Sequence, residues 1–199
     1  MTDLMNRPHP DCPADCPGTA ERGVDRQEPG TGERLNRLRA AVLGANDGIV
    51  STAAVVVGVA GATSDQTTIA MSGLAAVIGG AVSMALGEYV SVSSQRDSER
   101  AMGLAKEMQV NPWSAAVASF LSFLLGAALP FATALLAPAS WRIAAIFMLT
   151  LVALALTGAL SAKLGEAPVA RSVARIVVGG TMALAATFAI GSLFGANVG

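Results

Sequence analysis

The length of its uncharged apolar segments is the strongest constraint on this chain. No residue from Met71 to Gly87 carries a charge, and none does from Ile143 to Ala162. A water-soluble domain covers its outside with polar residues, and about 25% of its residues are charged. Here only 14% of 199 residues are charged and 53% are hydrophobic. The second window approaches the roughly 20 residues that cross a hydrocarbon core of about 30 Å, so the sequence predicts an integral membrane protein.

Five apolar spans are predicted, separated by short segments that contain proline, glycine or charge. A segment inside the bilayer must be helical, because only a helix satisfies its own backbone polar groups without water. We therefore predict an all-α fold with five transmembrane helices, in a membrane domain over residues 35–199. The expected spans are about 38–62, 68–91, 112–137, 141–162 and 172–196.

The basic residues predict the orientation of these helices. With five spans, twelve of the thirteen lysines and arginines fall on one side of the membrane, and only Arg142 falls on the other. Because basic loops stay in the cytosol, we expect a cytosolic N-terminus and a non-cytosolic C-terminus. The lack of an organelle address and the many alanines favour a bacterial inner membrane as the location.

Residues 1–34 are expected to form a disordered cytosolic tail. The first 33 residues hold five of the nine prolines, seven of the fourteen acids and almost no large apolar residue, which is typical of disorder. The tail has no apolar segment of the kind found in secretory signals. His9, Cys12 and Cys16 are weak candidates for metal ligands, because their spacing matches no structural zinc site. The alternative is that the cysteines are simply reduced thiols.

Two carboxylates, Asp47 and Glu88, lie inside the predicted spans. An ionisable group there costs at least about 2.5 kcal/mol on insertion scales, so it normally faces a cavity or a partner and marks an ion path. Asp47 follows Arg39 by eight residues, and Glu88 precedes Arg96 by eight residues in a helix of opposite direction. At a rise of about 1.5 Å per residue, both should lie roughly 12 Å from the same surface, where they could meet.

Neighbouring side chains predict the kind of cation that this path would take. Met84 and Glu88 share one helix face, and Asp47 and Ser51 share another. Oxygen ligands alone suit magnesium or calcium, whereas a thioether shifts the preference toward a transition metal such as Fe(II). The expected metal ligands are therefore Asp47, Met84 and Glu88. The other candidates for lining the path are Asn46, Ser51, Ser91 and Gln95.

Each expected ligand also has a structural interpretation. Met84 can fill a gap in a core, Glu88 can reach the headgroups, and Asp47 can hydrogen-bond a broken helix. If the two carboxylates do approach each other, their repulsion favours a proton on one of them, and metal binding would release it. The pair therefore also predicts proton-coupled transport.

Small residues recur at helical spacing in three of the spans. Such positions let helices approach closely in lipid, either inside the bundle or between two copies of the chain. The three sets are Gly44 with Gly48, then Gly79, Ser83 and Gly87, and finally Gly191 with Gly195.

Three segments resemble the signature blocks of the vacuolar iron transporter family. They are RAAVLGANDGIVSTAAVVVGVAGA (39–62), SGLAAVIGGAVSMALGEYVSVSSQRDSE (72–99) and NPWSAAVASFLSFLLGAALP (111–130), and the likeness runs from about Leu35 to the C-terminus. The resemblance implies a five-span homodimer that moves Fe(II), and often Mn(II), out of the cytosol in exchange for protons through a path at the dimer interface. It also implies that Asp47 and Met84 line this path, and it places Glu88 in the GEY motif.

The chain differs from many members of that family between its second and third spans. Many members insert a cytosolic domain there, rich in Glu and Met, that gathers metal. Here only eleven residues separate Glu99 from Asn111, so the chain resembles the short, nodulin-like branch. Asp97, Glu99 and Glu107 remain as weak cytosolic metal candidates, or as a plain solvated surface.

Other classes of function are less compatible with the sequence. We expect no enzyme and no permanently bound cofactor, because no nucleophile is paired with a base and no glycine loop could bind phosphate. A net charge of −1 disfavours a nucleic-acid partner. The expected partners are divalent metal ions, the lipid bilayer and a second copy of the chain. The alternatives are a manganese-selective or broad divalent-metal exporter, and a non-transporting membrane scaffold or metal-responsive partner.

Overall fold

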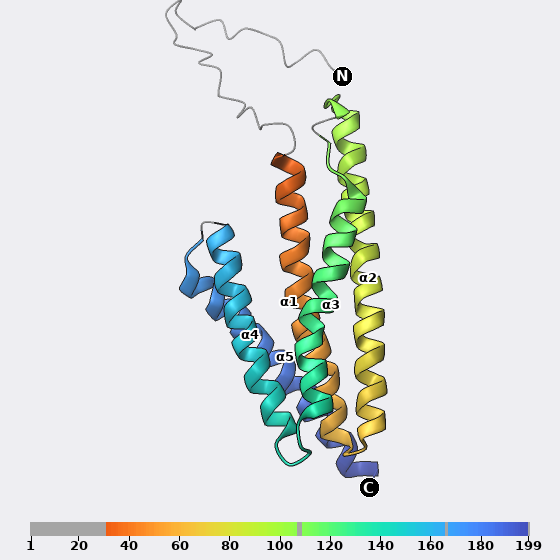
Figure 1. Ribbon diagram of the computed structural model, residues 1–199, viewed down its shortest axis with the longest axis vertical. Coiled ribbons are helices and arrows are strands. Elements are labelled where there is room, and N and C mark those ends of the chain that lie inside the picture. The colour runs from red at the N-terminus through yellow and green to blue at the C-terminus, as the bar shows by residue number, and fades with distance from the viewer. Residues whose placement is uncertain (1–30, 107–108, 166, 199) are drawn as a thin grey trace, which may run out of the picture.

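Five helices make up the part of the chain that the structure, a computed structural model, describes: residues 31–106, 109–165 and 167–198 (Figure 1). The helices are α1 (Thr31–Ala62), α2 (Gln66–Ala101), α3 (Pro112–Leu136), α4 (Arg142–Leu164) and α5 (Val169–Val198). Each of them is long and apolar enough to cross a membrane. The prediction of five helices of spanning length is therefore confirmed.

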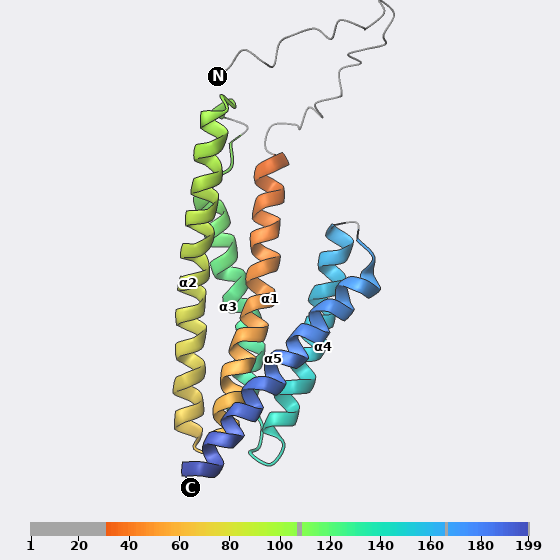
Figure 2. The ribbon, with the colours of Figure 1, turned by 180° about the vertical axis from the view of Figure 1, so that it is seen from behind.

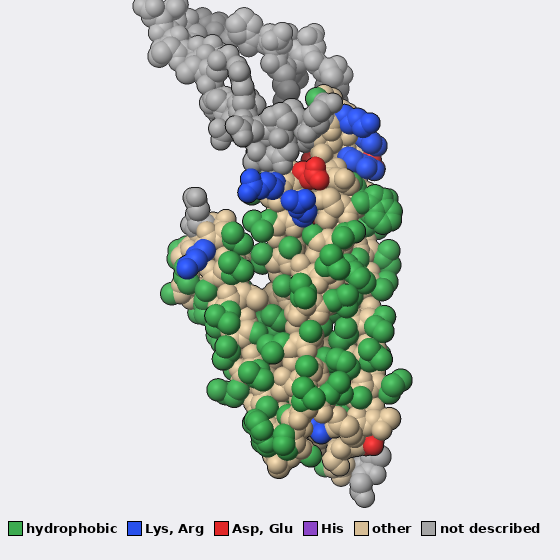
Figure 3. All heavy atoms as spheres, viewed as in Figure 1, with side chains coloured by type: hydrophobic (Ala, Val, Ile, Leu, Met, Phe, Trp, Pro, Cys, Tyr) green, Lys and Arg blue, Asp and Glu red, His purple; other side chains and the backbone are tan. Residues whose placement is uncertain are grey.

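Two helices extend well beyond their predicted spans. α1 begins at Thr31, seven residues before the expected start, and α2 continues to Ala101, ten residues beyond the expected end. The extensions are charged, and the charged side chains gather at the upper end of the molecule in Figure 3, where water can solvate them without breaking the helix. As a result, residues 31–34 belong to α1 and not to the expected tail.

α1 is the central helix of the bundle and contacts all four of the others. Consecutive helices run in opposite directions, so α1 begins at the upper end and α5 finishes at the lower end (Figures 1 and 2). α2 and α3 pack on one side of α1. α4 and α5 form a hairpin that meets the bundle at the lower end and diverges from it toward the upper end (Figure 2).

Glycines on α1 bring its backbone against the backbone of α3. A methyl group placed on Gly44 would lie 2.5 Å from the carbonyl oxygen of Ser119, and one placed on Gly48 would collide with the carbonyl oxygen of Phe123. Only glycine permits this approach, which lets two helices make extensive van der Waals contact in lipid. The prediction of close packing inside the bundle is thus confirmed for Gly44 and Gly48.

The other small-residue sets separate into two kinds. Gly191 and Gly195 on α5 pack against the backbone of α1, at Gly58 and Ala62 respectively. Gly79 and Gly87 on α2 instead have no atom within 4 Å of an added methyl group. The first pair therefore packs inside the bundle, whereas the face of α2 that bears Gly79 and Gly87 is uncovered in the described part of the chain.

The two ends of the bundle differ in charge. The described arginines and lysines all lie on segments at the upper end, except Arg142 at the lower end, as predicted. Arg142 is buried and donates hydrogen bonds to the side chain of Gln66 and to the carbonyl oxygen of Ala137. Trp113 near the upper end and Trp141 at the lower end are exposed, as is usual for aromatic side chains at the two membrane interfaces.

Candidate metal path

Asp47 lies halfway along α1, sixteen residues after Thr31 and fifteen before Ala62. Its side chain is exposed on the surface of the helix, and its carboxylate accepts no hydrogen bond from any described residue. The nearby hydroxyl of Ser51 donates to the backbone carbonyl of Asp47 at 2.7 Å, so it does not donate to the carboxylate. A charge at this depth requires a cation, a proton or a polar partner from outside the described chain.

Glu88 is buried, with an exposed fraction of 6%, and it is paired with Arg39. One guanidinium nitrogen of Arg39 donates to the Glu88 carboxylate at 2.8 Å and to the side-chain oxygen of Asn36 at 3.0 Å. The Arg39 side chain is itself 54% exposed. This ion pair joins α1 to α2 and compensates a buried negative charge, which would otherwise be costly.

The prediction that Asp47 and Glu88 lie at the same depth is wrong. A methyl group on Gly73 of α2 would lie 2.8 Å from the side chain of Val56, so these two positions are level. Fifteen residues farther toward the upper end, Glu88 is opposite Ala41. Asp47 is six residues deeper than Ala41, which is about 9 Å along the helix.

The error arose from the residues used to mark the surface. By the same pairing of α1 with α2, Arg96 lies opposite Glu33, six residues above Arg39. Arg39 and Arg96 therefore do not mark a common plane, because α2 continues well above the end of the apolar region. A count from the two arginines placed Glu88 too deep.

Met84 lies on the inward face of α2, as Glu88 does. It is half-buried against a cluster of buried side chains formed by Ala81, Phe123 and Ala127. Ser91 is exposed. The path candidates predicted on α2 therefore divide into an inward pair, Met84 and Glu88, and an exposed pair, Ser91 and Gln95.

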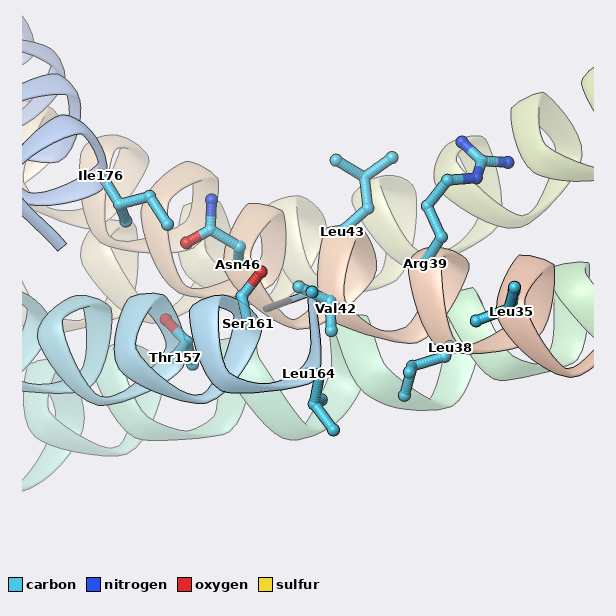
Figure 4. A pocket seen from close by; sticks show the side chains of 11 residues that line it. Leu35, Leu38, Arg39, Val42, Leu43, Asn46, Thr157, Ser161, Leu164 and Ile176 are labelled. Carbon is cyan, nitrogen blue, oxygen red and sulfur yellow. The ribbon is translucent and has the colours of Figure 1, made fainter. Parts of the chain in front are cut away.

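Asn46 faces different surroundings from its neighbour Asp47. It lines a cavity of about 490 Å³ between α1 and the α4–α5 hairpin, with Thr157 and Ser161 opposite (Figure 4). Its side-chain oxygen is buried and has no hydrogen-bond partner among the described residues. The candidate path residues on α1 are therefore distributed over two surfaces of that helix.

Of the two described acids near the end of α2, Glu99 holds the short connection between α2 and α3 in place, whereas Asp97 contacts only Arg100 on the same helix. The two carboxylate oxygens of Glu99 accept hydrogen bonds of 2.9 Å from the side chain of Gln95 and from the backbone nitrogen of Val110. Asp97 is exposed and lies 3.7 Å from Arg100. Gly103 makes the turn after α2 with a φ of 77°, a conformation that favours glycine. Glu99 thus has a clear structural role.

The remaining metal candidates, His9, Cys12, Cys16 and Glu107, lie outside the described residues. Within the described residues, no three His, Cys, Asp or Glu side chains are grouped closely enough to hold a metal ion. Within the described part of one chain, Asp47 and Glu88 therefore do not form a shared metal site. The carboxylate of Asp47 has no hydrogen-bond partner there, and Glu88 is paired with Arg39.

Sequence reasoning missed the role of Arg39. It was used only as a marker of the membrane surface, although it is the partner of the buried Glu88. A signal was present, because a buried carboxylate is almost always paired, and Arg39 is one of few cations near that end of α1.

Comparison with known proteins gives a consistent result over most of the chain. The model of the VIT family matches residues 38–107 and 101–192. "Vacuolar iron transporter homolog 1" of Arabidopsis thaliana is 44% identical over 173 residues, covering 83% of this chain and 86% of the relative. "Vacuolar iron transporter homolog 1" of Oryza sativa subsp. japonica is 43% identical over 194 residues, covering 88% and 84%.

Proposed function

Because this chain belongs to the VIT family, we propose that it is a membrane transporter that moves Fe(II), with Mn(II) as a second cargo, out of the cytosol in exchange for protons. The similar plant proteins are named as homologues of iron transporters, which supports metal transport in general and fits a role other than that of an enzyme. The choice of metal, the direction and the proton coupling are further parts of the proposal.

The unpaired carboxylate of Asp47 is the observation that carries this function. It lies at the midpoint of the central helix, and no described residue neutralises it. A carboxylate in a membrane span is expensive and normally serves an ion path or a proton relay. Metal ligands must be deprotonated, so an aspartic acid that binds a divalent cation releases its proton. One residue can therefore exchange a metal for a proton.

The orientation follows from the basic end of the bundle. Loops rich in arginine and lysine stay in the cytosol, so we place the upper end of Figure 1 on the cytosolic side and the end of α5 on the opposite side. Export then runs from the basic end, past Asp47, to the end that bears Arg142. The relatives are plant proteins named for the vacuole and give no support to the expected bacterial inner membrane, so we propose only a membrane location.

A second copy of the chain would complete the path in this proposal. Asp47 is exposed on a side of α1 that the described residues leave uncovered, and they leave the Gly79 and Gly87 face of α2 open as well. Small residues on an uncovered face allow two helices to approach closely. We infer a homodimer in which these surfaces meet, so that two copies of Asp47 supply ligands that one chain does not.

Glu88 and Met84 have auxiliary roles in this proposal. Glu88 can offer both oxygens to a metal only when Arg39 releases it, because the guanidinium occupies one of them. Met84 supplies a soft ligand if its thioether turns away from the Phe123 cluster. A thioether with carboxylates is compatible with both Fe(II) and Mn(II), which is why both metals are named.

The test is metal uptake into proteoliposomes across a pH gradient, with Fe(II) and Mn(II) measured separately. Wild type is compared with Asp47→Asn and with Asp65→Asn, which makes the same change in an acid outside the spans. We expect gradient-dependent flux in wild type and in Asp65→Asn, and at least a tenfold lower flux in Asp47→Asn. The elution volume of each variant checks that its fold and oligomeric state are intact.

The outcomes separate the proposal from its rivals. Wild-type flux that survives Asp47→Asn would overturn the role of this residue while leaving transport intact. An absence of flux for both metals in well-folded wild type would favour the non-transporting scaffold. Flux of Mn(II) alone would instead support a manganese-selective exporter, and flux of many divalent metals would support a broad divalent-metal exporter.

A further inference from the structure

Two adjoining cavities open at the basic end of the bundle, beside the first turns of α1. The first has a volume of about 490 Å³ and lies between α1 and the α4–α5 hairpin, while the second, of about 510 Å³, lies between α1, α3 and the end of α4. Both are lined by Leu35, Leu38 and Leu164. The notch between the hairpin and the rest of the molecule is visible in Figure 3.

The walls of the first cavity are mostly aliphatic. Along α1 it extends from Leu35 to Asn46, which is eleven residues or about 16 Å of helix. Leucine, valine and isoleucine side chains line most of this length, and polar side chains appear at the deep end, where Asn46 approaches Ser161 (Figure 4). A mostly aliphatic cavity of this length fits a hydrocarbon chain and gives a hydrated ion no carboxylate ligand.

The mouth of the two cavities is basic. Arg34 and Arg37 line the second cavity, are exposed, and form no ion pair or hydrogen bond with a described residue. Arg39 lines the first cavity, and its guanidinium is paired with Glu88 of α2. No aspartate or glutamate is among the described residues that line either cavity. The charge therefore repels a divalent metal and attracts an anion.

Aliphatic walls below free arginines match the two parts of an anionic phospholipid. Basic pockets between transmembrane helices on the cytosolic side are a recurrent site for anionic headgroups. We propose that these cavities bind one anionic phospholipid of the adjacent leaflet, with its acyl chains along Leu35, Leu38 and Leu164 and its phosphate against Arg34 and Arg37. The site is separate from Asp47 and does not depend on metal transport.

Lipid binding to the full-length chain can be measured by native mass spectrometry from mild detergent. The probes are dioleoylphosphatidylglycerol and dioleoylphosphatidylcholine, which have the same acyl chains. We expect the first bound phosphatidylglycerol to bind at least tenfold more tightly than phosphatidylcholine. The double variant Arg34→Gln/Arg37→Gln should weaken that binding about 25-fold, because each basic residue near an anionic lipid contributes roughly a factor of five.

Two controls test the place and the nature of the site. Arg171→Gln/Arg175→Gln removes two exposed charges at the same end that line neither cavity, and it should change the affinity less than threefold. Ser161→Leu fills the deep end of the first cavity and should weaken phosphatidylglycerol binding at least tenfold, whereas Thr181→Leu, on an exposed part of α5, should not.

Several results would overturn the proposal. Equal affinity for the two lipids, or equal loss in the two double arginine variants, would show a general membrane surface and no specific site. Displacement of the lipid by soluble glycerol 3-phosphate at similar concentration would assign the arginines to a free anion. Unchanged binding in a folded Ser161→Leu variant would exclude the cavity. None of these results bears on the flux of metal, so the lipid site can be disproved without affecting the proposed metal transport, and the reverse also holds.

Discussion

The guanidinium of Arg39 lies 2.8 Å from the carboxylate of Glu88 and joins the first helix to the second. The buried acid is thereby neutralised inside one chain, whereas Asp47, about 9 Å deeper, has no such partner among the described residues. Two carboxylates that look equivalent in the sequence therefore have different roles. Glu88 contributes to stability in the state observed, and Asp47 remains open to a cation.

The Arg39–Glu88 pair predicts unequal costs for its two neutralising substitutions. Arg39→Gln leaves a buried carboxylate without its donor and should lower the free energy of unfolding by about 1–3 kcal/mol. Glu88→Gln leaves a half-exposed arginine that water can solvate, so its cost should stay below about 1 kcal/mol. Unfolding by sodium dodecyl sulfate in mixed micelles measures both values.

The double variant Arg39→Gln/Glu88→Gln is the control for that prediction. It removes the unpaired charge, so it should be more stable than Arg39→Gln alone, with a measurable coupling between the sites. Equal costs for the two single substitutions, or purely additive effects, would mean that the pair does not hold the helices together.

Much of the fold could be predicted because membrane helices are specified locally. Uncharged windows of spanning length require helices, and a glycine pair such as Gly44 and Gly48 marks a close helix contact. Both features are read within one segment. The partner of that contact, the backbone at Ser119 and Phe123 on α3, is not visible in the sequence, since a small-residue face does not indicate which helix covers it.

The site was predicted less completely because it depends on register between helices. The depth of Glu88 was counted from Arg96, and a charged residue on a helix that projects into water does not mark the membrane surface. Asn46 and Asp47 are both predicted path residues, but adjacent residues on a helix point about 100° apart. Asn46 therefore lines the cavity beside α4 while Asp47 does not.

The surroundings of two glycines predict that alanine substitutions there have very different effects on the free energy of unfolding. Gly48→Ala places a methyl group against the Phe123 backbone, which has little freedom to move, so it should cost about 3 kcal/mol through overpacking. Gly87→Ala adds a methyl group in open space and should change the free energy of unfolding by less than about 0.5 kcal/mol. Detergent unfolding compares the two variants directly.

A larger side chain at Gly87 tests the proposed dimer. Gly87→Leu should leave the fold of one chain intact, because no atom of the described residues lies within 4 Å of a methyl group added there, while separating two copies that pack there. Cross-linking in liposomes should then show less dimer and near-normal helix content. A full yield of dimer would place the partner on another surface.

Glu99 should behave as a structural residue and not as a metal ligand. Its two oxygens are bonded to Gln95 and Val110, so Glu99→Gln should lower the unfolding temperature slightly and leave the metal concentration for half-maximal flux unchanged. Asp97→Asn is the matched substitution, because Asp97 is exposed and only loosely paired. A rise in that concentration in Glu99→Gln alone, with the fold intact, would instead support metal capture at this connection.

Asp65 predicts how stability depends on pH at the opposite end of the bundle. It caps α2, and its carboxylate accepts hydrogen bonds from the hydroxyl and the backbone nitrogen of Thr68 at 2.6 and 2.7 Å. These bonds favour the ionised form, the hydroxyl contributing most, so they lower the pKa of Asp65 below its ordinary value. A lowered folded-state pKa gives stability that is complete above the unfolded value of about 3.9 and disappears as the pH falls through the folded value.

Asp65→Asn keeps an amide that can cap the helix but removes the titration. Wild type should therefore have the higher unfolding temperature at neutral pH, and the difference between the two proteins should shrink when the pH is lowered below about 4. Thr68→Ala removes the hydroxyl donor, which raises the folded pKa of Asp65 toward its ordinary value. The acid-dependent loss of stability should therefore be smaller in Thr68→Ala and complete at a higher pH than in wild type. Melting curves of wild type and both variants between pH 7 and pH 3 test this directly. If the difference in unfolding temperature between wild type and Asp65→Asn stayed constant across that range, the cap would contribute through its geometry alone and not through its charge.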